Sequence, residues 1–243
     1  MRHMVLLVVG ASSDLGMATI RTIGKNYDHI LAHYRNMNDK LQALKNTEGY
    51  RLQLLRADLS SESEVRGLIR GIEASGNLPT HIVHFPAQKI MLRRFQKTPW
   101  DVFQQGLDVS LRSLALVCQA FLPRMAKQGK GKIVAILSAA VEGIPPKYSA
   151  DYVVAKYAML GLIKALAVEY EDKGITVNGI SPEYIETKFV TELPEAIRDN
   201  IKASSANGSV LVPDDIVPYI ARLLAEDGDP INGQNIIIPC GRL

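Results

Sequence analysis

The sequence predicts an α/β protein: one doubly wound domain with a mostly parallel seven-stranded sheet flanked by helices. Two observations predict it. Seven short runs rich in Val, Ile and Leu alternate with longer amphipathic stretches along all 243 residues. The runs are almost continuously apolar, as strands of a parallel sheet that is covered on both faces must be.

The predicted elements follow this alternation from end to end. The helix that begins near residue 61 has a serine cap and an acidic first turn, and the last helix has a proline near its first position. Strands are expected at residues 4–9, 29–34, 51–57, 81–85, 132–137, 175–180 and 234–239. Helices are expected near residues 15–25, 38–46, 61–74, 98–128, 149–172 and 213–226. Right-handed crossovers then give a doubly wound sheet. Because we find no repeat, low-complexity segment or linker, residues 1–243 are interpreted as one domain.

The composition narrows the class of partner. A formal net charge of +3 gives no reason to expect nucleic acid. Cys118 and Cys240 form neither a metal-ligand pair nor a disulfide framework, and the five histidines lack metal-ligand spacing, so we expect no metal site. The apolar run at 4–9 is too short for a membrane span, and no cleavage site follows it. We therefore expect a cytoplasmic protein with no membrane partner.

The segment from 183 to 212 breaks the alternation, because it is polar and weakly periodic and follows the sixth strand. Loops beyond the carboxyl ends of parallel strands bind ligands in such folds. The segment is therefore either a substrate loop or an ordinary surface insertion, and the sequence leaves both open.

A turn with the sequence GASSDLGMA directly follows the first strand, and Gly10 and Gly16 flank its small polar residues. A turn that opens a helix exposes N–H groups at the positive end of the helix dipole, and glycines let a pyrophosphate approach them. The Gly-Lys-Ser/Thr of an NTPase phosphate loop is absent. The turn therefore favours a dinucleotide site over a purely structural role.

The second predicted strand ends in HYRN, where an NAD site usually has an acidic residue for the ribose hydroxyls. This chain has Tyr34 and Arg35 instead, and a guanidinium can pair with a 2′-phosphate. We therefore expect NADP(H) rather than NAD, although Arg35 could simply be solvated. Asp58, after the third strand, could accept from an adenine amine or could cap the next helix.

The stretch YSADYVVAKYAM places Lys156 four residues after Tyr152, so both side chains share one face of a helix. A phenol has a pKa of about 10. An ammonium about 4 Å away, at an effective dielectric of about 20, contributes about 4 kcal/mol, or roughly three pKa units. Such a pair could protonate a carbonyl oxygen as hydride reaches its carbon. The spacing alone also occurs by chance.

Taken in order, GASSDLG, HYRN, ILSAA and YVVAK resemble the short-chain dehydrogenase/reductase family, in particular its 3-oxoacyl-acyl-carrier-protein reductase branch. The resemblance covers essentially the whole chain and implies a Rossmann-type fold. It implies that Tyr152 is the general acid/base, that Lys156 lowers its pKa and holds the nicotinamide ribose, and that Ser138 binds the substrate carbonyl. From residue chemistry alone, Ser138 could equally cap a turn. The implied coenzyme-binding residues are Gly10, Ser12, Ser13, Leu15, Gly16, Tyr34, Arg35, Asp58, Leu59, Ala87, Tyr152, Lys156, Pro182, Ile185 and Thr187.

Several positions depart from the family pattern. Asp14 replaces a glycine of the cradle, and we expect it to cap the helix and turn away from the phosphates. HFPAQ stands where the family has Asn-Asn-Ala-Gly, so that Pro86 must supply rigidity there. Asp108 occupies what resembles the place of the fourth catalytic residue, an asparagine. Glu183 and Cys240 replace glycines.

Two functions follow from these observations. The first is an NADP(H)-dependent oxidoreductase that acts on a ketone or secondary alcohol, with a 3-oxoacyl thioester on acyl carrier protein as one substrate class. The alternative is a catalytically impaired family member that serves as a nucleotide-binding sensor or partner subunit. A hydrolase is disfavoured because the chain has no G-x-S-x-G motif. The resemblance implies a homotetramer. The basic run at 127–132 and the pair Arg93-Arg94 could dock an acidic carrier or could be solvated.

Overall fold

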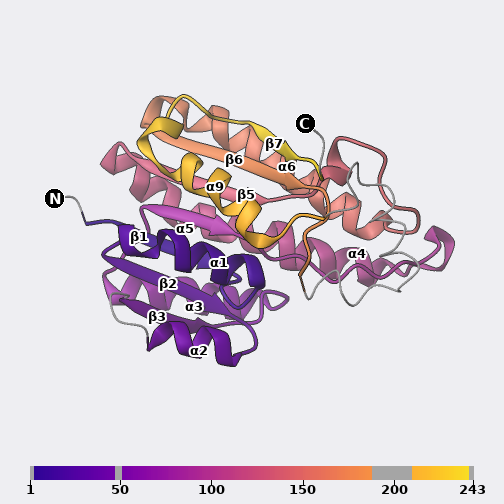
Figure 1. Ribbon diagram of the computed structural model, residues 1–243, viewed down its shortest axis with the longest axis horizontal. Coiled ribbons are helices and arrows are strands. Elements are labelled where there is room, and N and C mark those ends of the chain that lie inside the picture. Colours follow the sequence, from indigo (N-terminus) through magenta and orange to yellow (C-terminus); the bar gives the residue numbers. More distant parts are fainter. Residues whose placement is uncertain (1–2, 47–50, 188–209, 241–243) are drawn as a thin grey trace.

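The computed structural model describes residues 3–46, 51–187 and 210–240. Seven strands form one sheet in the order β3-β2-β1-β4-β5-β6-β7, and every neighbouring pair is parallel (Figure 1). The strands are β1 Val5–Val9, β2 His29–Tyr34, β3 Leu52–Arg56, β4 His81–His84, β5 Gly131–Ile136, β6 Ile175–Pro182 and β7 Asn235–Ile238. Each observed strand overlaps one predicted range, so the predicted α/β fold is confirmed.

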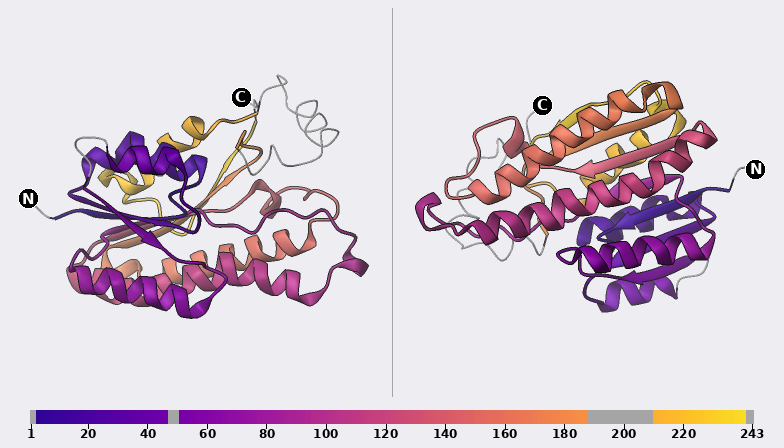
Figure 2. Two further views of the ribbon diagram at one scale, coloured as in Figure 1. Left: turned by 90° about the horizontal axis from the view of Figure 1, so that it is seen from below. Right: turned by 180° about the vertical axis from the view of Figure 1, so that it is seen from behind.

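Helices cover both faces of this sheet (Figure 2). One face carries α1 Asp14–Ile23, α2 Asp39–Lys45 and α9 Pro213–Leu224, which share a buried cluster with side chains such as Leu6 and Val8. The other carries α3 Glu62–Ser75, α5 Ser113–Gln128 and α6 Ala150–Glu169, which bury the alternate strand residues, such as Leu7 and Val9. Two apolar clusters on opposite faces explain why the strands read as unbroken apolar runs.

The predicted helix over 98–128 is divided. It consists of α4 Trp100–Leu107, a π-helical turn Asp108–Arg112, and α5. Single π turns inside α-helices occur frequently at functional sites. The residues that flank it, Leu107 and Ser113, have α-helical dihedrals and no side chain caps its start, so the sequence carries no capping or breaking signal for it.

The strand order reverses between β1 and β4, since β1 to β3 run toward one edge and β4 to β7 toward the other. In sheets of this kind, ligands bind beyond the carboxyl ends of the strands at such a switch point. The chain also brings the two ends of the predicted substrate loop together here. Ile185 and Leu211 form a β-bridge, and Glu186 N–H donates to the Leu211 carbonyl at 2.7 Å. The rest of that loop, 188–209, lies outside the described residues.

Among the residues that the structure describes, none of the helices has the length and apolar character that a membrane span requires.

Candidate active site

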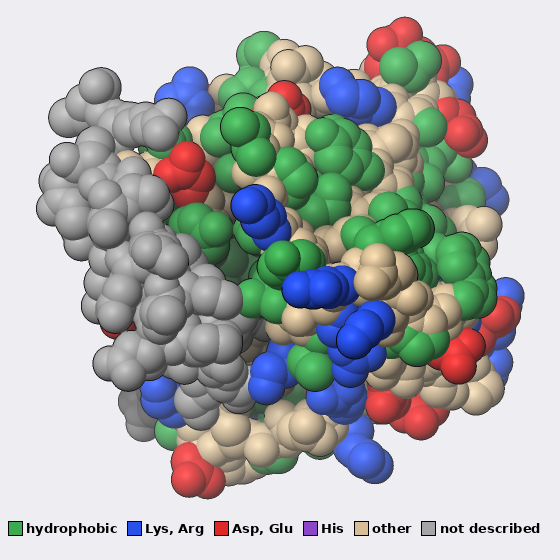
Figure 3. All heavy atoms as spheres, turned by 90° about the vertical axis from the view of Figure 1, so that its right-hand side faces the viewer, with side chains coloured by type: hydrophobic (Ala, Val, Ile, Leu, Met, Phe, Trp, Pro, Cys, Tyr) green, Lys and Arg blue, Asp and Glu red, His purple; other side chains and the backbone are tan. Residues whose placement is uncertain are grey.

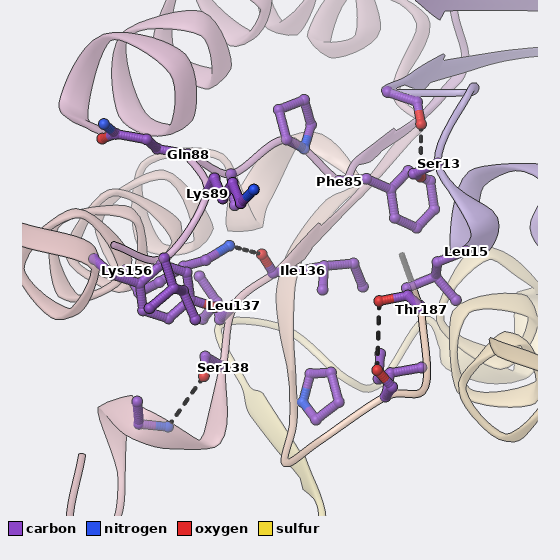
Figure 4. Close-up of a pocket in the computed structure, with 18 of the residues that line it drawn as sticks. Ser13, Leu15, Phe85, Gln88, Lys89, Ile136, Leu137, Ser138, Lys156 and Thr187 are labelled. Carbon is purple, nitrogen blue, oxygen red and sulfur yellow. Dashed lines mark hydrogen bonds between the residues drawn. The ribbon is translucent and has the colours of Figure 1, made fainter. Parts of the chain in front are cut away.

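A cavity of about 1320 Å³ opens beyond the carboxyl ends of the strands. Residues from the first turn, from the ends of β2 to β6 and from α6 line it, and Figure 4 shows several of them. Most of the predicted site residues lie here, namely Gly10, Ser12, Ser13, Leu15, Arg35, Asp58, Leu59, Ala87, Ser138, Tyr152, Lys156, Pro182, Ile185 and Thr187. The structure therefore brings together residues that are up to 177 positions apart in the sequence, from Gly10 to Thr187.

The first turn is built so that only glycine fits at its two ends. Gly10 has a φ of +86°, and a Cβ there would lie 3.3 Å from Phe85 Cβ. A Cβ at Gly16 would lie 2.6 Å from the Gly10 oxygen. Ser13 caps α1, since its Oγ accepts from Gly16 N–H at 3.0 Å and donates to the Gly10 carbonyl at 2.7 Å. The cap is thus Ser13, not Asp14 as expected; Asp14 is the first helical residue and lines the cavity.

His33 on β2 holds this turn through a side-chain hydrogen bond, and the sequence did not identify it as a site residue. Its Nδ1 accepts from Gly10 N–H at 3.1 Å, so Nε2 must carry the ring proton and donate to the Ala57 carbonyl at 3.1 Å. Burial lowers the pKa of His33, which favours this neutral form. Asn38 adds a second support, because its Nδ2 donates to the Ser12 carbonyl at 2.9 Å. The sequence signal that could have indicated His33 is a histidine within a predicted apolar strand.

Ser138, Tyr152 and Lys156 meet at the other side of the cavity. Ser138 follows β5 and caps a short 3₁₀ turn, where its Oγ accepts from Ala140 N–H at 3.3 Å. The Tyr152 hydroxyl is hydrogen-bonded to Ser138 as well. Lys156 lies one helical turn further along α6, with Nζ 5.8 Å from the centre of the Tyr152 ring. Ser138 therefore caps a turn and also contacts the tyrosine.

The pKa values differ from the expectation. Burial raises the pKa of Tyr152 to about 12, although the hydrogen bond with Ser138 opposes this shift. Burial lowers the pKa of Lys156 to about 7. Removal from water disfavours the charged form of each group, so desolvation outweighs the field that the sequence analysis assigned to the ammonium.

The Lys156 ammonium binds a backbone carbonyl. Nζ donates to the Ile136 oxygen at 2.7 Å (Figure 4). In β5, Lys132 N–H donates to the Thr80 carbonyl, so alternate residues up to Ile136 direct their peptide groups toward β4. In this register the donor opposite Ile136 would be the N–H of residue 86, but Pro86 has none. Pro86 thus leaves a carbonyl that the lysine can use.

A family model described as enoyl-(acyl carrier protein) reductase matches residues 10–242. The chain belongs to the short-chain dehydrogenase/reductase family. It resembles dehydrogenase/reductase SDR family member 4 of Bos taurus, with 27% identity over 98% of this chain and 87% of the relative. It is also 27% identical to the 3-oxoacyl-[acyl-carrier-protein] reductase FabG of Rickettsia bellii, over 98% of this chain and 95% of the relative. A solved structure of 4-hydroxyisoleucine dehydrogenase complexed with NADH has a TM-score of 0.89 and 26% identity, covering 98% of each chain.

At the end of the cavity next to β2 and β3, Arg35 is exposed and lies close enough to Asp58 to lower the pKa of that carboxyl. Hydrogen bonds to Asp58 from Ser60 N–H at 2.9 Å and from Ser60 Oγ at 2.7 Å are the larger causes of that lowering. Asp58 therefore caps the turn after β3. Tyr34 and Gly16 are not in the described lining; Tyr34 packs against the core, and Gly16 acts through the close approach described above.

The structure does not bring Asp108 to the described lining of this cavity. Its carboxylate lies 2.7 Å from Arg112 Nη1, and it accepts from Gln104 Nε2 at 2.9 Å. Both partners lie on the same helical segment, so the carboxylate belongs to the π turn. The asparagine-like catalytic role expected from the sequence has no support in this arrangement.

Glu183 and Cys240, which replace family glycines, join the ends of β6 and β7. Glu183 Oε2 accepts from Cys240 N–H at 2.7 Å, and Cys240 Sγ lies 3.5 Å from the Tyr184 carbonyl oxygen. Both residues line the cavity. The glutamate therefore links the segment after β6, which follows Pro182 and contains Ile185, to the segment after β7.

At the outer end of the cavity, a backbone hydrogen bond joins the segment after β4 to the segment before α6. Gln88, Lys89 and Arg93 follow β4 on one wall, and Arg93 N–H donates at 2.8 Å to the carbonyl of Tyr148, which precedes α6. Tyr148 has a φ of 68°, an unfavourable conformation for a non-glycine residue. Figure 3 shows this side of the molecule, where Lys and Arg side chains lie among hydrophobic ones.

Proposed function

We propose that the chain is an NADP(H)-dependent oxidoreductase that transfers hydride between a nicotinamide coenzyme and a ketone or secondary alcohol. One observation carries the proposal. The hydrogen-bonded pair of Ser138 and Tyr152 shares a single cavity with the glycine cradle at the start of α1.

The cradle fits a dinucleotide. The Gly10 and Gly16 positions exclude a Cβ, and the start of α1 lines the cavity through Leu15 and through Ser12 and Ser13, which precede the helix. N–H groups at a helix N-terminus bind phosphate. Asp58 and Leu59 lie where the adenine would bind, and Ala87, Pro182, Ile185 and Thr187 lie toward the nicotinamide end. When bound, the coenzyme supplies or accepts the hydride at the substrate carbon.

The chain's own residues handle the substrate oxygen. The Tyr152 hydroxyl donates a proton to the carbonyl oxygen during reduction, and Ser138 Oγ donates a hydrogen bond to the same oxygen. Because burial raises the pKa of Tyr152 to about 12, the phenol keeps its proton at neutral pH and is ready for reduction. Oxidation would need the phenolate, which a charged Lys156 beside it favours.

Arg35 supports the choice of NADP(H). Its guanidinium is exposed at the adenosine end, the Asp58 carboxylate beside it already accepts from Ser60, and a 2′-phosphate can pair with a guanidinium bidentately. For the substrate, the relative from Rickettsia bellii named as a 3-oxoacyl-acyl-carrier-protein reductase supports a 3-oxoacyl thioester as one class to test.

An oligomer is supported by α6. Val154, Tyr157 and Val168 on this helix are exposed at 46%, 49% and 69%, although its opposite side packs in the core. A helix that is apolar all round is usually buried, which agrees with a homotetramer built on α5 and α6. Light scattering on the purified chain measures the mass; a monomer would contradict this assembly. The proposal keeps the cytoplasmic location that the sequence predicts.

The test is a substrate panel run with both NADPH and NADH. It contains acetoacetyl thioesters and neutral diketones, and the wild type is compared with Tyr152→Phe. We expect NADPH oxidation by the wild type and at least about a 100-fold lower kcat for the variant, with NADPH affinity unchanged. Tight NADPH binding without turnover on any carbonyl would instead favour the nucleotide-binding sensor. Equal turnover by the variant would remove Tyr152 from the reaction.

A further inference from the structure

His84, the last residue of β4, is fully buried on the face of the sheet that α5 and α6 cover. It stands beside Ala135 in the ladder, and Ala135 packs with side chains of those two helices. An apolar strand residue would fill this place at lower cost, because a buried imidazole has two nitrogens that require partners.

The contacts of His84 fix its tautomer. Nε2 lies 2.9 Å from Ser113 Oγ, and the Ser113 hydroxyl donates its own hydrogen to the Val109 carbonyl at 2.6 Å. The serine oxygen must therefore accept from Nε2–H. This leaves Nδ1 as a bare acceptor, and Nδ1 is buried without a hydrogen-bond partner among the described residues. A buried acceptor of this kind costs about 1–3 kcal/mol, so its presence calls for an explanation.

Lys156 is the ammonium group that acts on this imidazole. Its Nζ binds the carbonyl of Ile136, the residue after the ladder partner of His84, so both side chains reach the same end of β4 and β5. Lys156 is 2% exposed, and an ammonium has three donors, of which the Ile136 bond uses one. After burial, the charge of Lys156 is the largest cause that lowers the pKa of His84, to about 3, so the imidazole stays neutral.

We propose that His84 is a positioning residue for Lys156. Its Nδ1 accepts a hydrogen bond from one water to which the Lys156 ammonium also donates, and so holds the charged lysine beside Tyr152. The inference rests on the proposed oxidoreductase function, because its consequence is that Lys156 stays protonated where the reaction needs it.

Within the part of the chain that the structure describes, few other charged groups act on His84 and Lys156. His33, on β2, also lowers the pKa of His84, and burial lowers the pKa of His33 itself. Asp108 and Arg112, on the turn that carries Val109, are paired with each other at 2.7 Å. Tyr152 lies on the same helix as Lys156 and is protonated at neutral pH. A change in the pH dependence of the reaction after substitution of His84 can therefore be assigned to Lys156 and its coupled phenol.

Two amide variants separate the two nitrogens of His84. In His84→Gln the side-chain amide reaches the place of Nε2 and keeps the bond to Ser113, but no acceptor replaces Nδ1. In His84→Asn the amide oxygen replaces Nδ1, and the bond to Ser113 is lost. Each variant loses one buried hydrogen bond, so their thermal stabilities should fall by similar amounts, and stability cannot account for a difference in activity.

Loss of the acceptor lowers the pKa of Lys156, and activity that needs the ammonium is lost as pH rises through that pKa. We therefore expect the alkaline limb of the kcat profile to move about one unit lower in His84→Gln, which is about a tenfold lower kcat on that limb. His84→Asn should keep the wild-type profile, with kcat within about threefold. A wild-type profile for His84→Gln, or equal shifts in both variants, would overturn the proposal.

A second measurement does not depend on turnover. The carbon NMR signal of the Lys156 Cε reports its titration, and Lys156→Met assigns that signal. We expect the Lys156 pKa to fall in His84→Gln and to stay at the wild-type value in His84→Asn. If the wild type reduces no carbonyl compound with either coenzyme, the proposed function fails, but this titration still decides the role of His84. An unchanged lysine pKa in His84→Gln would contradict it.

Discussion

Lys156 carries an ammonium that is 2% exposed, and burial lowers its pKa to about 7. In the unfolded chain the pKa returns to about 10.5. Between these values the unfolded chain binds a proton that the folded chain lacks, so stability should rise with pH from about 7 to 10.5. Below that window the folded state must bury the full charge.

Lys156→Met should therefore stabilise the fold by roughly 1–4 kcal/mol below pH 7, with the gain vanishing as pH approaches the unfolded value. Urea unfolding as a function of pH measures it, and Lys164→Met, an exposed position on the same helix, is the control. Turnover should be lost in the first variant only. A destabilisation that is constant with pH would show that the ammonium holds the fold together through its contacts.

Arg35 is the residue on which the choice of coenzyme depends in the proposed function. A charge-assisted hydrogen bond to a phosphate contributes about 2 kcal/mol, or about 30-fold in affinity. Arg35→Ala should therefore raise the NADPH Kd by about that factor and the NADH Kd by less than about threefold. Fluorescence titration measures both, with Lys40→Ala, an exposed cation that is not in the described lining, as the control. Equal losses for the two coenzymes would remove the 2′-phosphate assignment.

The residues that the sequence could identify differ in kind from those it could not. Ser138, Tyr152 and Lys156 stand in short motifs at fixed places in an alternating α/β chain, so their meeting follows from topology. His33 and His84 lie inside apolar strands, and only the structure shows which peptide or hydroxyl group each one contacts. The lowered phenol pKa expected from Lys156 was wrong, because a charge calculation from spacing omits desolvation, which raises the pKa of Tyr152.

At the scale of elements, the strands were the most predictable. The strands β1, β4, β5 and β6 are buried along their whole length, which requires a nearly unbroken apolar run. The helix over 98–128 was less predictable, since the π turn at Asp108–Arg112 is flanked by residues with α-helical dihedrals and no side chain caps its start. Asp108 was assigned to catalysis from its place in the family pattern, but the turn aims its carboxylate at Arg112.

Asp108→Asn tests this placement. The ion pair is only partly buried, with side-chain exposures of 17% and 27%, so its loss should destabilise the chain by about 1–2 kcal/mol. The kcat should stay within about twofold of the wild type. Thermal unfolding and steady-state kinetics measure the two effects, and Asp101→Asn, exposed in the first turn of α4, is the control. A large loss of kcat without a loss of stability would restore a catalytic role to Asp108.

At the scale of the whole molecule, the two edges of the sheet have different tasks. The cavity lies at the carboxyl ends of the strands, and ion pairs lie at their amino ends. Lys130 lies 3.4 Å from Glu226, and the 2%-exposed Lys132 is paired with Asp229. These contacts account for much of the basic run at 127–132, so they favour a structural role for it over the docking of an acidic carrier. Sequence alone showed the charges but not the acidic residues, about 100 positions away, that meet them.

Asp229→Asn should separate these tasks. The substitution leaves the buried Lys132 ammonium without its carboxylate, and loss of a hydrogen bond to a charged group costs about 2 kcal/mol. For a chain of this size we expect Tm to fall by about 4–8 °C. Because Lys132 stands at the start of β5 and Ser138 follows its end, kcat and KM should stay at wild-type values at 25 °C. Asp227→Asn, an exposed neighbour, is the control. If kcat fell in proportion to stability, the two edges would be coupled, and the cavity would depend on the amino edge for its geometry.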